Sequence, residues 1–143
     1  MHDQIKLTVD EAVDRLSRQV AEADALRDEH DRDNITWGMY IYQMRAWQFA
    51  LPQSQTLAYL LPALQGEVGE LSQIFAKIER DKGGCILDDD IERIKSEIGD
   101  VLWMLAGLTS LYNLDLGEIA WGNVQKLTDR QRRGKINGSG DDR

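Results

Sequence analysis

Two short stretches of this sequence place acidic residues at the same spacing. Residues 67–70 read "EVGE" and residues 97–100 read "EIGD", so each stretch is acid, aliphatic, glycine, acid. Carboxylate oxygens are the ligands that hard divalent cations such as Mg²⁺ prefer, and a carboxylate can also act as a general base. Two matched pairs therefore indicate a metal site that handles an anionic substrate.

Both pairs lie on the apolar side of a helix that advances about 100° per residue. Glu67 falls in the middle of the apolar stripe and Glu70 at its edge, and Glu97 and Asp100 repeat this placement. The stripe residues are Leu64, Leu71, Ile74 and Ile78 in the first stretch and Val101, Met104, Leu108 and Leu111 in the second. Acids three residues apart more often mark a solvated helix face. The pair in "EAVD" at 11–14 fits that description, whereas the two later pairs are expected to face inward.

Inward-facing carboxylates need compensation. Two unit charges about 5 Å apart repel by roughly 3 kcal/mol at an effective dielectric constant of about 20, and desolvation adds to this cost. Either some of the acids are protonated or cations lie among them. The chain has only two histidines, His2 and His30, and one cysteine, Cys85, so a Cys/His zinc site is implausible. The expected cation is Mg²⁺, for which Mn²⁺ may substitute.

Each acidic pair encloses a glycine, Gly69 or Gly99. A glycine inside a helix costs about 1 kcal/mol relative to alanine, so a reason for it is needed. Small residues let two helices approach closely, and we expect the glycines to bring the four acids together. Tight helix packing without any metal is the alternative explanation for the glycines alone.

The last predicted helix carries charge of the opposite sign. Asn123, Lys126, Arg130 and Arg133 recur on one stripe, and Lys135 follows in the glycine-rich tail "GKINGSGDDR". This stripe is interpreted as a phosphate clamp for a substrate at the metal site. The alternatives are a solvated basic face near a helix C-terminus and, for the tail, a disordered chain end.

Four tryptophans are candidates for the core, for an interface or for stacking on a nucleobase. Trp47 is the candidate for a base pocket, with Gln48 and the residues around Asn34 beside it. Trp37, Trp103 and Trp121 are assigned mainly to the core or to an interface.

Five helices are predicted to position these residues, and no strand is expected. Thr8 and Glu11 form a capping box, Pro52 ends the second helix, and Ser54 or Thr56 caps a third helix that Pro62 should kink. The second helix has an apolar stripe at Trp37, Tyr40, Ile41, Met44, Trp47 and Leu51, after the polar gap "DEHDRDN". The expected ranges are 8–31, 36–50, 54–82, 88–112 and 115–133.

The length of 143 residues suggests a single domain, 1–143, and the net charge of −8 argues against general nucleic-acid binding. Within it we expect N-terminal helices at 1–53, a helical core at 54–133 and the tail at 134–143. No secretory segment and no apolar run long enough for a membrane span is evident, so the expected location is the cytoplasm, or the host cytoplasm for a phage gene.

Three stretches resemble the MazG-like nucleoside triphosphate pyrophosphohydrolases, which belong to an all-α superfamily that includes the dimeric dUTPases. They are "GEVGEL" at 66–71, "EIGDVLWML" at 97–105 and "NVQKLTDRQRRG" at 123–134. The resemblance covers about residues 55–143, and the tail is similar to the ending of small phage and bacterial members. The family pattern is E-E-x-x-E followed by E-x-x-D, and here Gly66 replaces the first acid.

The resemblance implies that Glu67, Glu70, Glu97 and Asp100 are metal ligands. It also implies that Asn123, Lys126 and Arg130 hold phosphate, in a helical bundle that works as a homodimer or homotetramer with its sites near subunit interfaces. A second copy is also expected because five amphipathic helices in so short a chain leave apolar surface uncovered.

The expected reaction is Mg²⁺-dependent hydrolysis of a nucleoside triphosphate at the α–β bond, with Glu67 or Glu70 as general base. A purine deoxynucleotide such as dGTP is favoured, because tryptophans near the pocket offer a large stacking surface. The alternatives are a dUTPase or a phosphoribosyl-ATP pyrophosphohydrolase of the same superfamily, and a non-enzymatic acidic interaction module.

Overall fold

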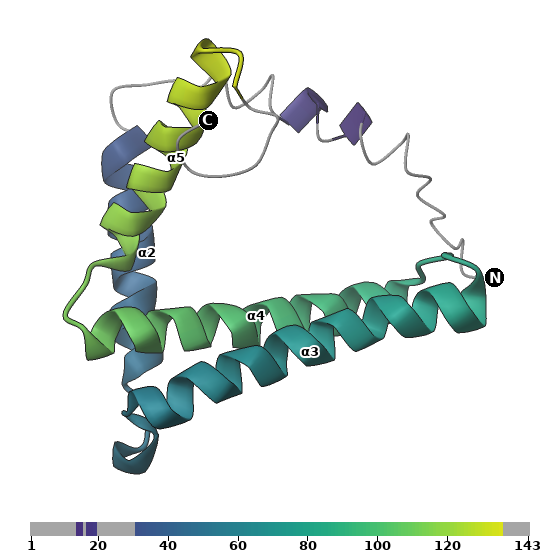
Figure 1. Ribbon diagram of the computed structural model, residues 1–143, viewed down its shortest axis with the longest axis horizontal. Helices are drawn as coiled ribbons and strands as arrows, with labels where there is room; N and C mark the ends of the chain where they lie inside the picture. Colours follow the sequence, from purple (N-terminus) through teal and green to yellow (C-terminus); the bar gives the residue numbers. More distant parts are fainter. Residues whose placement is uncertain (1–13, 16, 20–30, 136–143) are drawn as a thin grey trace.

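The computed structural model describes residues 14, 15, 17–19 and 31–135. Every regular element within them is helical: α2 (Asp31–Trp47), the 3-10 helix η1 (Pro52–Ser54), α3 (Leu57–Lys82), α4 (Asp88–Leu111) and α5 (Leu116–Arg132) (Figure 1). The all-α prediction is therefore confirmed for the described part of the chain. Most of the predicted helix at 8–31 and residues 136–143 of the tail lie outside the described residues.

The predicted starts of the later helices follow from their capping residues. Of the two candidate caps for α3, Thr56 is the one used, because its hydroxyl accepts a hydrogen bond from the backbone N–H of Tyr59 at 3.3 Å. Ser54 instead donates to the carbonyl of Leu51 at 2.8 Å within η1. Asp115 caps α5 by accepting from the N–H groups of Gly117 and Glu118. These side chains satisfy donors that a helix start leaves without partners.

The turn between α3 and α4 is fixed by a buried carboxylate. Gly83 ends α3 in the left-handed conformation, at φ 55°. Asp90, in the first turn of α4, accepts from the Lys82 ammonium at 2.7 Å and from the Leu87 backbone N–H at 3.1 Å. The hydrogen bond from Lys82, with the one from Leu87, holds the pKa of the Asp90 carboxyl below its usual range. This contact ties the end of α3 to the start of α4.

The second helix differs from its prediction in both its bounds and its packing face. It starts at Asp31, inside the predicted polar gap, with Asp31 and Asp33 in the first turn, where the helix dipole favours acids. Most of the predicted stripe is wrong, because Trp37, Tyr40, Met44 and Leu51 are 37–65% exposed. Ile41 and Trp47 of that stripe are half-buried. The residues that pack on the core are instead Met39, Tyr42, Gln43 and Ala46. Large apolar residues surround this helix on all sides, so the face that packs is decided by the small Ala46, which admits close contact.

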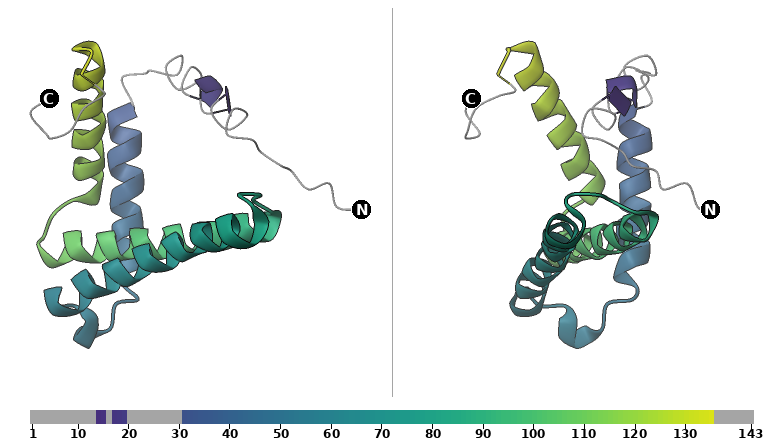
Figure 2. Two further views of the ribbon diagram at one scale, coloured as in Figure 1. Left: turned by 45° about the vertical axis from the view of Figure 1, so that its right-hand side comes forward. Right: turned by 90° about the vertical axis from the view of Figure 1, so that its right-hand side faces the viewer.

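The helices form two pairs that run across each other. α3 and α4 make a long antiparallel hairpin, and α2 and α5 lie side by side across one end of it (Figures 1 and 2). The core between the pairs is built on Ala46, Ala106 and Leu116. Trp103 of α4 packs against it and donates from its ring N–H to the Ala46 carbonyl at 3.0 Å. This packing fixes where α2 crosses α4.

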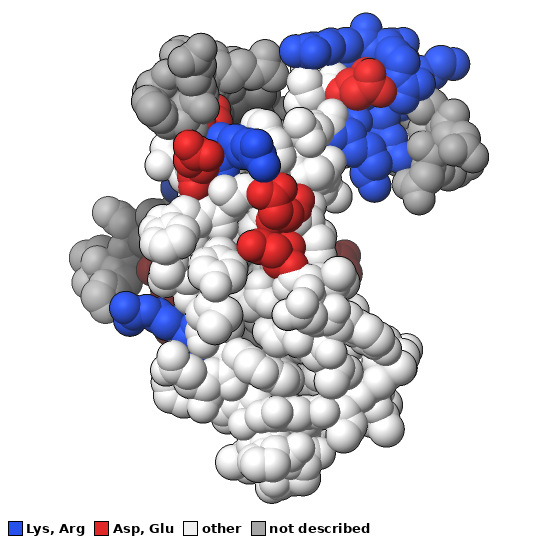
Figure 3. All heavy atoms as spheres, turned by 90° about the vertical axis from the view of Figure 1, so that its left-hand side faces the viewer, with Lys and Arg blue, Asp and Glu red and all other residues white. Residues whose placement is uncertain are grey.

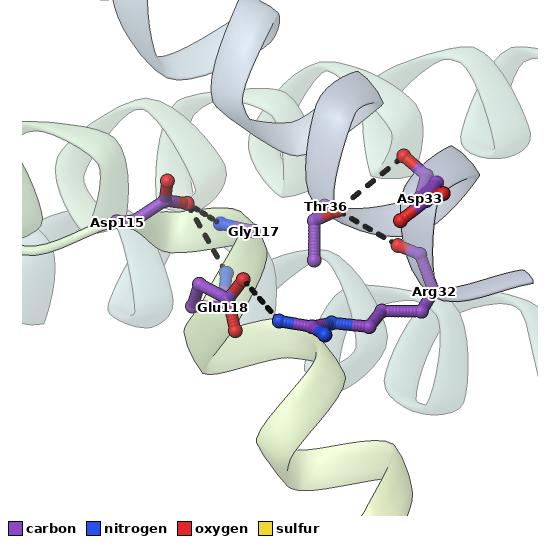
Figure 4. A network of polar contacts seen from close by, with 6 residues as sticks. All are labelled: Arg32, Asp33, Thr36, Asp115, Gly117 and Glu118. Carbon is purple, nitrogen blue, oxygen red and sulfur yellow. Dashed lines mark hydrogen bonds and ion pairs between the residues drawn. The ribbon is translucent and has the colours of Figure 1, made fainter.

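A close contact joins α2 to α5 (Figure 4). A Cβ atom added at Gly117 would lie 2.2 Å from the backbone oxygen of Thr36, so only glycine fits there. Beside it, Arg32 forms an exposed ion pair with Glu118 at 3.1 Å. None of the helices in the described residues has the length and apolar character needed to cross a bilayer.

Candidate metal centre

The α3–α4 hairpin brings three of the predicted acids together. Glu67 and Glu70 on α3 and Glu97 on α4 each offer a carboxylate oxygen, and these oxygens all lie within 4.8 Å of one another. A Mg²⁺ ion with ligand distances of about 2.1 Å holds oxygens up to about 4.2 Å apart. Small side-chain rotations therefore suffice for these three groups to share one ion. The donor set is all oxygen, as a hard cation requires.

Asp100 is not one of the three acids whose oxygens meet, yet among the neighbouring charges it acts most strongly on Glu67. It lies one turn after Glu97 on α4 and is exposed, as Glu70 is, whereas Glu67 and Glu97 are half-buried. Burial raises the pKa of the Glu67 carboxyl, and the charges of Asp100, Glu70 and Glu97 raise it further. All four predicted acids thus repel one another around Glu67, and a bound cation would relieve that repulsion.

The two glycines do not play the part expected of them. A Cβ atom added at Gly69 or Gly99 would meet no heavy atom within 4 Å, so alanine would fit at both positions in this chain. The contact between α3 and α4 is made instead by buried aliphatic residues, which include Leu60, Ile74 and Met104. The expectation that the glycines bring the acids together is therefore wrong within one chain.

The predicted phosphate clamp lies away from the acids. α5 leaves the hairpin where α4 ends, and its basic end points away from α3 and α4 (Figures 1 and 2). At about 1.5 Å per residue, Lys126 is roughly 15 Å along α5 from Leu116, while Asp100 is roughly 16 Å back along α4 from Leu111. The structure therefore does not bring Lys126 and the acids together within one chain.

The other members of the predicted stripe gather at the same end of α5. In Figure 3 the largest group of Lys and Arg side chains lies at one end of the molecule, other basic side chains lie farther along the same face, and the opposite end of this face is free of charge. Asn123, Lys135 and Arg133 are exposed and Arg130 is buried. Arg133 donates to the carboxylate of Asp129 at 2.8 Å.

The residues predicted to form the base pocket do not lie together. Trp47 is half-buried and packs where a Cβ at Gly107 would come within 3.1 Å of its ring. This contact lies about 10 Å along α4 from Asp100. Trp47 also lines an open cavity of about 380 Å³ with Gln43 and Ser110. Asn34 is exposed on α2 and Gln48 is exposed just after it. Neither residue lines the cavities that Trp37, Trp47 and Trp121 line.

The remaining tryptophans serve the core or the surface. Trp37 stacks on Tyr40 with ring centroids 6.0 Å apart, on the exposed side of α2. Trp121 is half-buried and lines a second open cavity, of about 430 Å³, between α2 and α5. Trp103, through its hydrogen bond to Ala46, belongs to the core.

One residue near the acids was not anticipated from the sequence. Tyr42 of α2 is half-buried against the core. Burial raises the pKa of its phenol, and the charge of Asp100 raises it further. Its hydroxyl therefore lies on the acidic side of the α2–α4 contact. The available signal was its position one turn before Ala46 on the face that packs against α4.

Comparison with known proteins identifies the region that contains both acid pairs. Residues 55–134 match the model of the MazG nucleotide pyrophosphohydrolase domain. The chain is also 39% identical over 87 residues to the Gene 37 protein of Mycobacterium phage L5, which covers 61% of this chain and 76% of that protein. No solved structure matches the chain significantly. The matched region begins just before α3 and ends just after α5.

Proposed function

The chain belongs to the MazG nucleotide pyrophosphohydrolase family, and from this premise we propose that it hydrolyses nucleoside triphosphates to a nucleoside monophosphate and pyrophosphate. The observation that carries the proposal is the meeting of Glu67, Glu70 and Glu97 from two helices within 4.8 Å. Such a cluster is suited to Mg²⁺, or to Mn²⁺ in its place, and a triphosphate is a substrate that needs its charge offset.

The four acids have two roles in this proposal, metal binding and general-base catalysis. Glu67, Glu70, Glu97 and Asp100 would hold Mg²⁺, which would offset the charge of the triphosphate and lower the pKa of a nearby water. Either Glu67 or Glu70 accepts a proton from that water as its oxygen bonds to the α-phosphorus. The bond from the α-phosphorus to the bridging oxygen breaks, and pyrophosphate leaves. The remaining contribution of the chain is to position the reactants.

A second copy of the chain completes the site in this proposal. Asn123, Lys126, Arg130, Arg133 and Lys135 carry the phosphate-binding role, yet α5 directs them away from the acids of its own chain. They can serve the acids of a neighbouring copy if two hairpins pack together.

An uncovered apolar face of the hairpin supports that arrangement. Val68 and Ile98 are 46% and 50% exposed. Val68 precedes Glu70 by two residues and Ile98 precedes Asp100 by two residues. Each apolar side chain therefore lies on nearly the opposite side of its helix from that acid. Leu61, Phe75 and Leu105 extend this face and are 38–46% exposed. A homodimer or homotetramer would cover it.

The proposed substrate is a purine deoxynucleoside triphosphate such as dGTP, with Trp47 as the stacking residue. The direct test measures pyrophosphate release from each canonical ribo- and deoxynucleoside triphosphate, with and without Mg²⁺. We expect release only with the metal and fastest with a purine deoxynucleotide. Faster release from dUTP or dCTP would overturn the substrate assignment. An absence of release from every triphosphate would favour a non-enzymatic acidic module.

A further inference from the structure

The contacts of α2 with α4 follow a definite order along α4. Toward the C-terminal end of α4, Gln43 donates its side-chain amide to the Ser110 hydroxyl at 3.1 Å, and also to the Leu114 carbonyl just beyond that end at 2.9 Å. Trp47 packs at Gly107. The side of α2 that carries Gln43 and Trp47 is therefore occupied by structural contacts with the C-terminal half of α4. The acids of α4 lie toward its N-terminal end.

The opposite side of α2 faces the acids. The Ala46 carbonyl accepts from Trp103, and Tyr42 lies where the charge of Asp100 acts on it. With Ala46 set at 0°, Trp47 lies at about +100°, Tyr42 at about −40° and Arg45 at about −100° around the helix. Going around α2 from Trp47 to Ala46 and then to Tyr42, the partner on α4 changes from Gly107 to Trp103 and then to Asp100. The next position around α2 in the same direction is Arg45. Helix geometry thus places position 45 on the flank of α2 that turns toward the acidic side of the hairpin.

Arg45 is available for a ligand. It is exposed, and among the described residues no hydrogen bond or ion pair is formed by its guanidinium. No other Lys or Arg occurs at 46–76 or at 101–125. Lys77 and Arg93 lie toward the turn end of the hairpin, where their charges act on Asp81 and Asp90 respectively. Lys95, two residues before Glu97, is paired with Glu92 at 2.6 Å. Among the described residues, Arg45 is thus the unpaired cation on the flank of α2 that turns toward the acids.

We infer that Arg45 is a phosphate-binding residue that acts within its own chain, donating hydrogen bonds to non-bridging oxygens of the triphosphate held at the acidic cluster. The inference rests on the proposed function and adds to it a residue that is separate from the α5 stripe. A guanidinium suits this role because it stays charged and presents a planar pair of donors to two phosphate oxygens. The ordinary alternative is a cation that only interacts with the C-terminal end of the α2 dipole.

The test uses the whole chain and the variants Arg45→Met, Arg45→Lys and Arg32→Met. Arg32→Met is the matched control, because it removes the same charge from the same helix at an exposed pair with Glu118. Titration calorimetry measures binding of inorganic tripolyphosphate in the presence of Mg²⁺. Electron paramagnetic resonance measures binding of Mn²⁺ without phosphate, and thermal unfolding reports the fold.

We expect Arg45→Met to weaken tripolyphosphate binding about ten- to a hundredfold. Arg45→Lys should recover part of the loss, and Arg32→Met should stay within about threefold of the wild type. Mn²⁺ should bind Arg45→Met more tightly, because a positive charge beside the acids has gone. A purely structural role would not move the two affinities in opposite directions.

Unchanged tripolyphosphate binding in Arg45→Met would overturn the assignment of Arg45 and leave the proposed function standing. A joint loss of Mn²⁺ and tripolyphosphate binding with a lower unfolding temperature would also overturn it, because that result marks a structural role. If the wild type binds neither Mn²⁺ nor tripolyphosphate, the proposed function fails, and the role of Arg45 fails with it.

Discussion

Among single residues, Glu67 combines burial with the strongest crowding by like charge, since three other acids act on it. Glu67→Gln or Asp100→Asn should lower turnover at least about a hundredfold, because each change removes a ligand from the ion. The fold should stay intact or become more stable, since a like charge has gone from the cluster. Pyrophosphate release and thermal unfolding in chelator measure the two effects.

Glu92→Gln is the control for those variants. Glu92 lies on α4 near the acids in sequence, but it is exposed and pairs with Lys95 at 2.6 Å. Its loss should leave turnover and unfolding nearly unchanged. Wild-type rates in Glu67→Gln or Asp100→Asn would remove the acids from the metal centre.

The four acids were predicted from the sequence because a repeated spacing within one helix is local information. Tyr42 was not, because its place near Asp100 depends on where α2 crosses α4. The role proposed for Arg45 depends on the same crossing. That crossing is set by the small side chains at Ala46 and Ala106 and by the hydrogen bond from Trp103. Local periodicity favoured the large residues of α2, and Trp37, Tyr40 and Met44 among them proved exposed.

At the scale of elements, the caps Thr56 and Asp115 were predictable because capping chemistry is local. The start of α4 at Asp88 also agrees with its predicted range. The position of α5 was not predictable, since the sequence places its basic stripe beside an apolar one but says nothing of its direction. The rigid contact at Gly117 with Thr36 turns α5 toward α2 and away from α3.

The ion pair that joins α3 to α4 makes hairpin stability depend on pH. The folded-state pKa of Asp90 is lowered by Lys82 and by the Leu87 N–H. The paired carboxylate therefore adds stability above its unfolded pKa, which is about 3.8 for an unperturbed aspartate. That stability should be lost as the pH falls through 3.8 toward the lower folded value. Thermal unfolding at pH 7 and at lower pH values should show the loss.

Asp90→Asn should unfold at a lower temperature at pH 7 and show a smaller change over the same acidic range. Asp89→Asn, which changes an exposed neighbour, is the control. Equal pH dependence in Asp90→Asn and the wild type would mean that this pair does not stabilise the hairpin.

The α5 stripe leads to a prediction about the nucleotide. Lys126→Met should raise the Michaelis constant for the triphosphate about ten- to a hundredfold, since a charge-assisted contact to phosphate is worth roughly 1.5–3 kcal/mol. Binding of the monophosphate should change less. Deletion of residues 135–143 should weaken nucleotide binding without much loss of thermal stability. Titration of a non-hydrolysable dNTP analogue tests both variants, and unchanged affinities would remove the clamp or the tail from the site.

For the whole molecule, the uncovered hairpin face predicts self-association. The chain should be a dimer or tetramer by light scattering at micromolar concentration, because an apolar face of this size is rarely left to solvent. Ile98→Glu should favour the monomer by placing a charge in that face. Trp37→Glu, at a residue 65% exposed on α2, should not. A wild-type monomer under these conditions would contradict the interface.

Association also decides whether acids and cations from different chains form one site. Glu67→Gln lacks a metal ligand and Lys126→Met lacks a phosphate contact, so each alone should be nearly inactive at low substrate concentration. If α5 serves the acids of the neighbouring copy, a mixed dimer contains one site in which both groups are intact. Random exchange of subunits should then restore about a quarter of wild-type activity, since half of the dimers are mixed and each has one such site. If both groups act within one chain, every site in the mixture keeps one defect. The activity would then stay at the level of the separate variants, and the proposal that a second copy completes the site would be wrong.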